Sequence, residues 1–295
     1  MRLLLTGGSG FVGRRLAALA LRDGHNVTAL SRDPQAAERA APGVRWLAAD
    51  LAQPGDLGPR LAAAKPDAVI HLAALIKGTA EQLAAVNVEA TAALLAALRK
   101  LPAPPRFVYV SSFAVEDTPP TPYSESKLAA EEVVRAGKLP FVILRPALVY
   151  GPNDAGNTLP LVAKLRAGSM WLPAGGRTRI QPVFVDDVAR ACLEAASRPA
   201  AVGHSYRLGG PQPVAVRDFR LAVRDATGGK VRLRTIPLPL FALMARGFQF
   251  LGRPGPLGVL SFHRADHAVD SSEAQRDLGF APRPLDVGLR ETFAS

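Results

Sequence analysis

The 295-residue chain has a single cysteine, Cys192, and aromatic residues make up only 6% of it. One thiol can form neither an intrachain disulfide nor a cysteine-based metal site, so we expect no metal centre and a reducing compartment. No apolar run reaches the roughly 18 residues that a membrane-spanning helix needs. The leucines after Arg2 give way to a glycine-rich turn before the apolar core of a signal peptide has formed. The sequence therefore predicts a cytoplasmic protein without a membrane span.

Acidic residues are also scarce, at 25 Asp and Glu against 36 Lys and Arg, which gives a formal charge of +11. Such a balance can indicate binding to nucleic acid, to a membrane surface or to an anionic small molecule. Residues 1–204 hold 23 basic and 17 acidic residues, and residues 205–295 hold 13 and 8, without a basic block or interleaved aromatic residues. This spread along the chain argues against nucleic acid as a partner.

Short apolar runs alternate with longer segments in which Ala and Leu recur at helical spacing. Because the runs are apolar throughout, helices should cover both faces of a parallel sheet. The pattern predicts an α/β fold with a doubly wound parallel sheet. The expected strands are residues 2–6, 26–31, 44–48, 68–72, 107–111 and 141–144.

Three glycines, Gly7, Gly10 and Gly13, recur every three residues where the first expected strand gives way to a helix. The first permits a tight turn, the second lets the backbone approach a pyrophosphate, and the third lets the helix pack closely. Free amides at the start of the helix then face the anion. The turn predicts a site for an adenine-dinucleotide cofactor.

The second expected strand ends in Ser31 and Arg32 rather than in a carboxylate that would bond a ribose 2′-hydroxyl. A guanidinium binds a 2′-phosphate through forked, charge-assisted hydrogen bonds. Alternatively, Arg32 is a solvated cation and Asp33 supplies the missing acid. We favour NADP(H) as the cofactor, with NAD(H) as the alternative.

Asp50 and the run 71–74 follow the third and fourth strands, at the strand ends where ligands bind in open α/β sheets. His71 has apolar neighbours, so we expect a buried histidine with satisfied hydrogen bonds rather than a general base. Asn87 lies on the apolar stripe of a helix, where a buried amide needs partners. The Asn87 amide should form hydrogen bonds that hold this helix against the strands on the cofactor side, or hydrogen bonds to backbone atoms alone.

Tyr123 and Lys127 are four residues apart on an expected helix and so share one face. A free tyrosine has a pKa of about 10, and a positive neighbour that favours the phenolate makes it a useful acid or base. Ser112, at the end of the fifth strand, is placed to hold the same substrate oxygen. Asp186 and Asp187 stand at the start of a helix, which they should stabilise rather than act as an acid/base pair.

After residue 152 proline and glycine become frequent, and helical pieces at 185–197, 216–227 and 239–251 are separated by irregular segments. We expect residues 1–151 to form the dinucleotide-binding domain, with 181–208 returning to it. Residues 152–295 should form mainly a smaller substrate-binding region. The apolar segment 237–251 either belongs to the core of that region or meets an apolar substrate, a partner or a membrane.

In these motifs the chain resembles the extended short-chain dehydrogenase/reductase superfamily, and in particular its NAD-dependent epimerase/dehydratase group. The resemblance continues in Leu144-Arg145-Pro146, in residues 149–152 and 183–188, and in a closing helix at 274–280. It implies a Rossmann domain with a C-terminal substrate lid and hydride transfer at nicotinamide. Tyr123 would be the acid/base, Lys127 would bind the nicotinamide ribose and tune Tyr123, and Ser112 would position the reacting oxygen. The predicted cofactor contacts are Gly7, Gly10, Phe11, Val12, Gly13, Ser31, Arg32, Asp50, Leu51, Leu72, Ala73, Ala74, Asn87, Ser111, Tyr123, Lys127 and Pro146.

Two departures from the family pattern concern the substrate. Ser112 and Tyr123 are only 11 residues apart, closer than is common in the family, so the mouth of the active site should differ. Ile180 stands where nucleotide-sugar epimerases carry an arginine for the phosphates, with Arg177 and Arg179 nearby. A nucleotide-sugar substrate is therefore not favoured.

Residues 181–187 instead resemble the NADPH-binding accessory subunit of respiratory complex I, whose relatives often lack the tyrosine and lysine. The leading interpretation is an NAD(P)-dependent dehydrogenase, reductase or epimerase acting on a small molecule. The alternative is a non-catalytic NADPH-binding scaffold or sensor that acts with a protein partner. The resemblance also implies a homodimer formed through the helices at 83–98 and 124–136.

Overall fold

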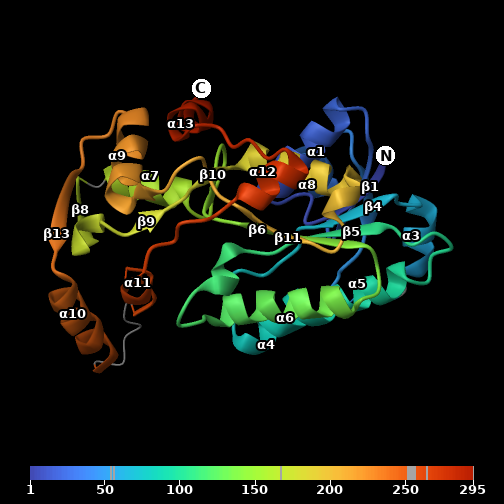
Figure 1. Cartoon of the computed structure of the whole chain (residues 1–295), viewed down its shortest axis with the longest axis horizontal. Coiled ribbons are helices and arrows are strands. Elements are labelled where there is room, and N and C mark those ends of the chain that lie inside the picture. The colour runs from blue at the N-terminus through green and yellow to red at the C-terminus, as the bar shows by residue number, and fades with distance from the viewer. Residues whose placement is uncertain (54, 56, 167, 251–256, 264, 295) are drawn as a thin grey trace. The chain divides into compact units, whose positions relative to one another are not determined.

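The computed structural model describes residues 1–53, 55, 57–166, 168–250, 257–263 and 265–294 (Figure 1). The chain forms two compact units. Unit 1 consists of residues 1–146, 185–208 and 270–281, and unit 2 consists of residues 147–184, 209–269 and 282–295. The segment 270–281 in unit 1 is a return of the chain that the sequence analysis did not include.

Unit 1 is built on a seven-stranded parallel sheet in the order β11-β6-β5-β4-β1-β2-β3. All six predicted strands are present, within two residues at each end. The seventh, β11, was not predicted, because its four residues include the exposed Arg207 and give no continuous apolar run. The strands are β1 (Arg2–Thr6), β2 (Asn26–Ser31), β3 (Arg45–Ala48), β4 (Ala68–His71), β5 (Arg106–Val110), β6 (Phe141–Pro146) and β11 (Ser205–Leu208).

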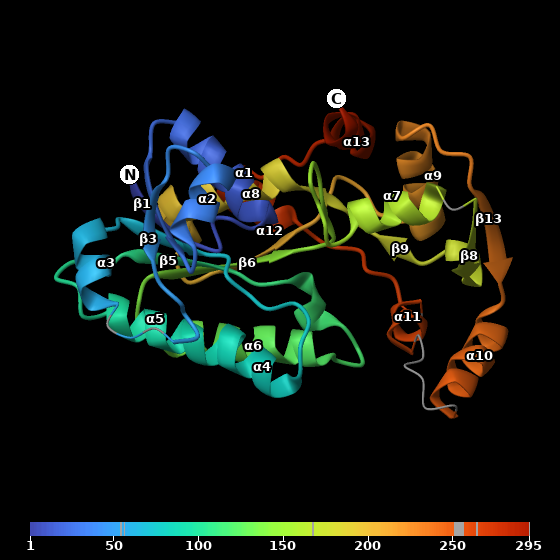
Figure 2. The same cartoon turned by 180° about the vertical axis from the view of Figure 1, so that it is seen from behind.

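Helices cover both faces of this sheet. Figures 1 and 2 show α1 and α8 on one face and α4, α5 and α6 on the other. A π-helical turn, η1 (Ala85–Glu89), joins α4 to α5, and a 3-10 helix, η2 (Phe113–Glu116), follows β5. The helices are α1 (Phe11–Arg22), α2 (Pro34–Ala40), α3 (Gly58–Ala64), α4 (Ala80–Ala84), α5 (Ala90–Leu98), α6 (Pro122–Ala136), α8 (Val185–Ser197) and α12 (Ser272–Leu278), with a 3-10 turn at Pro199–Ala201.

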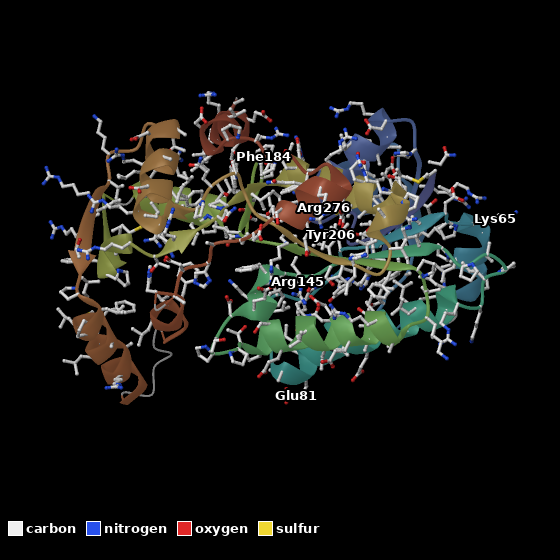
Figure 3. The ribbon with its side chains drawn as sticks, viewed as in Figure 1. Lys65, Glu81, Arg145, Phe184, Tyr206 and Arg276 are labelled. Carbon is white, nitrogen blue, oxygen red and sulfur yellow. The ribbon has the colours of Figure 1, made fainter. Side chains whose placement is uncertain are left out.

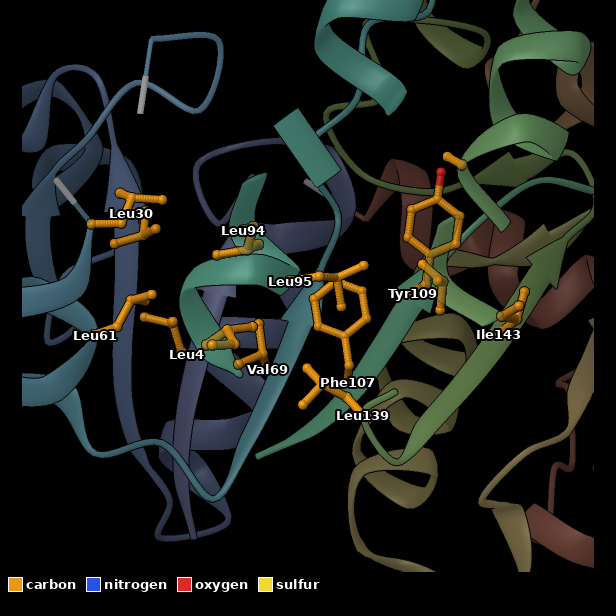
Figure 4. Close-up of a cluster of buried hydrophobic side chains, with 14 residues drawn as sticks. Leu4, Leu30, Leu61, Val69, Leu94, Leu95, Phe107, Tyr109, Leu139 and Ile143 are labelled. Carbon is orange, nitrogen blue, oxygen red and sulfur yellow. The ribbon is translucent and has the colours of Figure 1, made fainter. Parts of the chain in front are cut away.

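The core of unit 1 explains why its central strands consist mainly of apolar residues. All four residues of β4 are buried, since helices cover the sheet on both sides. Figure 4 shows Val69 of β4 and Phe107 of β5 in one cluster with Leu95 of α5. The doubly wound parallel sheet predicted from the sequence is therefore confirmed.

Unit 2 consists of helices and two-stranded sheets. Tyr150 lies at its centre, where its ring meets those of Phe184 and Phe219 edge-on. The helices are α7 (Thr158–Arg166), α9 (Val216–Ala226), α10 (Leu238–Phe250), α11 (Leu257–Phe262) and α13 (Leu285–Phe293), with a 3-10 turn at Ala174–Gly176. The strand pairs are β7 (Val149–Tyr150) with β10 (Val183–Phe184), β8 (Ser169–Pro173) with β13 (Arg232–Ile236), and β9 (Arg179–Ile180) with β12 (Val214–Ala215).

The three helical pieces predicted beyond residue 152 correspond to α8, α9 and α10. Leu251, the last residue of the third prediction, lies outside the described residues. Among the described residues, no helix is both long enough and apolar enough to cross a membrane.

Candidate active site

The glycine turn between β1 and α1 is too tight for side chains. Gly7 has a φ of +67°, and a Cβ there would lie 2.7 Å from the Ala73 nitrogen. A Cβ on Gly13 would lie 2.2 Å from the Gly7 carbonyl oxygen. Gly10, the N-cap of α1, has no side chain to cover the first amides of the helix. The turn therefore leaves these amides open to an anion, as a dinucleotide pyrophosphate requires.

Thr6, the last residue of β1, connects this turn to the end of β4. Its hydroxyl accepts a hydrogen bond from the Ala73 amide (3.2 Å) and bonds Nδ1 of His71 (2.6 Å). Nε2 of His71 bonds the Thr91 hydroxyl at 3.0 Å. Burial lowers the pKa of His71 to about 3, so the imidazole is neutral. The structure thus shows the buried, satisfied histidine that the sequence predicts, and the two threonines are partners that the sequence analysis missed.

Asn87 is buried in η1, and three hydrogen bonds satisfy its amide. Nδ2 donates to the Leu75 carbonyl and to the Ser126 hydroxyl, both at 2.9 Å, and Oδ1 accepts from the Leu75 amide at 2.7 Å. Asn87 therefore fixes the segment after β4 against α6. Its contact with a cofactor stays a prediction.

The loop after β2 presents one unpaired charge. The Asp33 carboxylate caps α2 by accepting a hydrogen bond from the Ala36 amide at 2.9 Å. The Ser31 hydroxyl donates to the Asp33 carbonyl at 3.0 Å. Arg32 is exposed and makes no hydrogen bond or ion pair with the residues that the structure describes. Both interpretations of Arg32, as a ligand for a 2′-phosphate and as a solvated cation, stay predictions.

Ser112 and Tyr123 meet at the carboxyl end of β5. Ser112 caps η2, and its hydroxyl accepts a hydrogen bond from the Ala114 amide at 3.2 Å. Tyr123 is the second residue of α6, and the start of this helix is fixed by a capping box between Thr121 and Ser124. The Ser112 side chain lies close enough to the Tyr123 phenol to lower its pKa.

The protonation of Tyr123 differs from the sequence-based prediction. Burial raises the pKa of the phenol above its usual value, and the nearby Ser112 side chain only partly offsets this. We predicted that Lys127 would favour the phenolate. In the structure the Lys127 ammonium instead donates to the Val110 carbonyl at 2.8 Å and lies 4.2 Å from the centroid of the Tyr109 ring.

Lys127 is itself fully buried, and burial lowers its pKa to about 7. The Glu131 carboxylate, one helical turn further on, opposes this shift. Glu131 is also buried and accepts hydrogen bonds from Arg145 on β6, at 2.9 Å from Nε and 2.6 Å from Nη2 (Figure 3 labels Arg145). The sequence analysis missed Glu131, although Tyr123, Lys127 and Glu131 repeat at a spacing of four.

The remaining predicted cofactor contacts all follow the carboxyl end of a strand. Because the strands are parallel, these positions lie along one edge of the sheet. The structure thus brings the predicted residues to the same edge, and their contact with a cofactor stays a prediction. They are Phe11 and Val12 beyond β1, Ser31 and Arg32 at β2, Asp50 and Leu51 after β3, Leu72, Ala73 and Ala74 after β4, Ser111 after β5, and Pro146 ending β6.

Asp186 lies in the first turn of α8. Its carboxylate accepts hydrogen bonds from Nε (2.6 Å) and Nη2 (2.5 Å) of Arg15 on α1. The ion pair joins the two helices that cover the same face of the sheet. This supports a structural role for Asp186.

A pocket of about 460 Å³ lies at the opposite edge of the sheet, where the strands begin. Its lining includes Arg2, Asn26 and Arg45, the first residues of β1, β2 and β3. The pocket contains none of the residues predicted to bind a cofactor or to act in catalysis.

The sequence model of the NAD-dependent epimerase/dehydratase family matches residues 3–209. The 2-alkyl-3-oxoalkanoate reductase of Stenotrophomonas maltophilia is 28% identical over 100% of this chain and 99% of its own. The UDP-glucose 4-epimerase of Mycolicibacterium smegmatis is 31% identical over 100% of this chain and 96% of its own. Among solved structures, UDP-glucuronic acid 4-epimerase from Bacillus cereus in complex with NAD has a TM-score of 0.77 at 21% identity, over 100% of this chain and 98% of its own. The chain is therefore an enzyme of the NAD-dependent epimerase/dehydratase family.

Proposed function

We propose that the chain is an NADP(H)-dependent reductase in which Tyr123 protonates the oxygen of a substrate carbonyl. The observation that carries this proposal is the pairing of Tyr123, at the start of α6, with Ser112, just after β5, whose side chain lies close enough to lower the pKa of the phenol. Lys127 follows one turn later on the same helix face. A carbonyl oxygen placed beside both hydroxyls would accept a proton from Tyr123 and a positioning hydrogen bond from Ser112.

The Tyr123 phenol carries its proton at neutral pH, which the donor in a carbonyl reduction requires. A phenol that keeps its proton at neutral pH can donate it as negative charge develops on the carbonyl oxygen. Ser112 holds the same oxygen, and Lys127 is proposed to bind the nicotinamide ribose. NADP(H), when bound, supplies or accepts the hydride. The open amides of the glycine turn would hold its pyrophosphate, and Arg32 its 2′-phosphate.

We propose a carbonyl on an aliphatic chain as the substrate, rather than a nucleotide sugar. Ile180 lies buried in β9, 4% exposed, where nucleotide-sugar epimerases are expected to carry their phosphate-binding arginine. Its neighbour Gln181 is engaged with backbone, donating to the Gly210 carbonyl and accepting from the Val269 amide, both at 2.7 Å. The similarity to a 2-alkyl-3-oxoalkanoate reductase over the full chain supports the same substrate class.

The test is turnover of NADPH and NADH by the purified chain with 3-oxoalkanoates, simple aliphatic ketones and UDP-glucose. We expect oxidation of NADPH by a 3-oxoalkanoate, with the hydroxy product identified by mass. Interconversion of UDP-sugars without net cofactor oxidation would instead show an epimerase. Tight NADPH binding with no turnover, together with a co-purifying protein, would show the scaffold. A homodimer through α4, α5 and α6 stays a prediction.

A further inference from the structure

The helix α10 of unit 2 presents apolar side chains to solvent. Leu240, Leu243 and Met244 are 50%, 67% and 47% exposed. Their spacing of three and four residues places them on one face of the helix. Ala245 is fully buried on another face of the helix, and α10 contacts α11. The exposed face of α10 is thus apolar, whereas the solvent face of a globular helix is normally polar.

The neighbouring helix α11 extends this surface. Figures 1 and 2 show α10 and α11 side by side at one end of unit 2, at a distance from α9. Val259 and Phe262 of α11 are 43% and 38% exposed. We call the five side chains Leu240, Leu243, Met244, Val259 and Phe262 the α10–α11 patch. A cluster of exposed large apolar residues marks an interaction surface rather than ordinary protein exterior.

The charge near the patch is mainly positive, although the exposed Asp266 follows Phe262 by four residues. Residues 226–265, which include both helices, contain six Lys and Arg and no Asp or Glu. Arg232 and Arg234 are exposed on β13, which ends two residues before α10, and Arg246 is exposed on α10 itself. Unit 2 as a whole holds 15 basic and 6 acidic residues, a formal charge of +9 out of the +11 of the chain.

An aromatic side chain lies beside these arginines. Trp171 of β8 is 56% exposed, and the guanidinium carbon of Arg234 lies 5.5 Å from the centroid of its ring. Tryptophan favours the boundary between lipid and water, because its ring is apolar and its N–H is polar. A surface that combines exposed leucines, a tryptophan and an excess of arginines fits a bilayer rather than an uncharged apolar partner.

We propose that the α10–α11 patch docks on the surface of an anionic phospholipid bilayer. The helix α10 would lie in the plane of the interface with Leu240, Leu243 and Met244 among the acyl chains, and the flanking arginines would pair with phosphate headgroups. The docking is peripheral and reversible. It goes beyond the proposed reductase activity and does not depend on it.

Binding of the full-length protein to vesicles tests this proposal. We expect co-sedimentation with vesicles of phosphatidylcholine and phosphatidylglycerol, little with phosphatidylcholine alone, and loss of binding in high salt. Leu243→Glu should weaken binding to the mixed vesicles at least tenfold. The matched control is Val202→Glu, an exposed apolar residue of unit 1 given the same charge, which should bind like the wild type. Replacing Arg232 and Arg234 with Gln should weaken binding to the mixed vesicles several-fold.

Three results would overturn the proposal: the first two concern vesicle binding and the third concerns self-association. The first is an absence of binding to the mixed vesicles, and the second is binding that Leu243→Glu leaves unchanged. The third is a wild-type dimer that Leu243→Glu converts to a monomer without any vesicle binding, which would show that a second copy covers the patch. Because cofactor and substrate are absent from the assay, none of these results bears on the reductase proposal.

Discussion

In the proposed cofactor site, Arg32 is the residue that would select NADP(H) over NAD(H). It is exposed and makes no ion pair within the described part of the chain, whereas the Asp33 carboxylate is engaged in capping α2. We predict that Arg32→Asp removes the preference for NADPH over NADH. Hydrogen bonds to charged groups contribute about 2 kcal/mol, so the affinity for NADPH should fall roughly 30-fold.

Thermal stabilisation of the protein by each cofactor measures this preference. Arg39→Asp is the control, because Arg39 is an exposed arginine of α2 and the change in charge is the same. If the Arg32 variant kept the wild-type preference for NADPH, the 2′-phosphate would have to bind elsewhere.

His71 makes the stability of the fold depend on pH. Burial lowers its pKa to about 3 from the usual 6.5, so between these values the unfolded chain binds a proton that the folded chain does not. Stability should therefore fall as the pH decreases from 6.5 towards 3. His71→Asn removes this titration, so its melting temperature should depend less on pH in this range. The same change at the exposed His204 should leave the slope unchanged, and equal slopes in all three proteins would exclude His71 as the cause.

At the scale of the element, the start of α1 depends on the absence of a side chain at Gly13. A Cβ there would lie 2.2 Å from the Gly7 oxygen and 2.7 Å from the Gly8 Cα. Both are backbone atoms, so they can move away only if the turn itself is distorted. We predict that Gly13→Ala costs about 3 kcal/mol of stability and abolishes cofactor binding. Gly247→Ala is the control, because a Cβ there meets no atom within 4 Å. Unfolding by urea and a titration with NADPH give the two readouts, and wild-type values for Gly13→Ala would contradict this account of the turn.

The helix α6 is held to β6 by a buried ion pair. Glu131 is 0% exposed and bonds Arg145, so Glu131→Gln leaves the guanidinium without its full counter-charge. We predict a loss of about 3 kcal/mol in the free energy of unfolding. Glu132→Gln changes the adjacent, exposed residue in the same way and should cost less than about 0.5 kcal/mol. Similar losses in both variants would show that the pair does not hold the helix.

The sequence predicted the elements that carry a local signal. Runs such as β4, buried at every residue, must be apolar, and the turn at Gly7 can only be glycine, so both are visible in the sequence. Glu131 was missed because its partner, Arg145, comes from another element and only the folded chain brings them together. The direction of the Tyr123 pKa was missed for the same reason, since burial is a property of the folded chain.

At the scale of the whole molecule, charge is even along the chain and uneven between the units. Each unit is assembled from three separate segments of the chain. Charge counts over residues 1–204 and 205–295 therefore mix residues of both units, which hides the difference between them. Unit 1 carries 21 basic and 19 acidic residues and is close to neutral, and unit 2 carries the excess. The segment 270–281 was assigned to the second region for a similar reason: nothing in its sequence reveals that Asp277 bonds Tyr206 of β11 in unit 1.

The rate of NADPH oxidation by Tyr123→Phe, compared with the wild type on the same carbonyl substrate, tests the central claim most directly. The account predicts a fall in kcat of about 100-fold or more, with the affinity for NADPH unchanged. Tyr206→Phe removes one hydroxyl from the same unit outside the site and should retain wild-type turnover. Wild-type turnover in Tyr123→Phe would contradict the claim that this phenol supplies the proton.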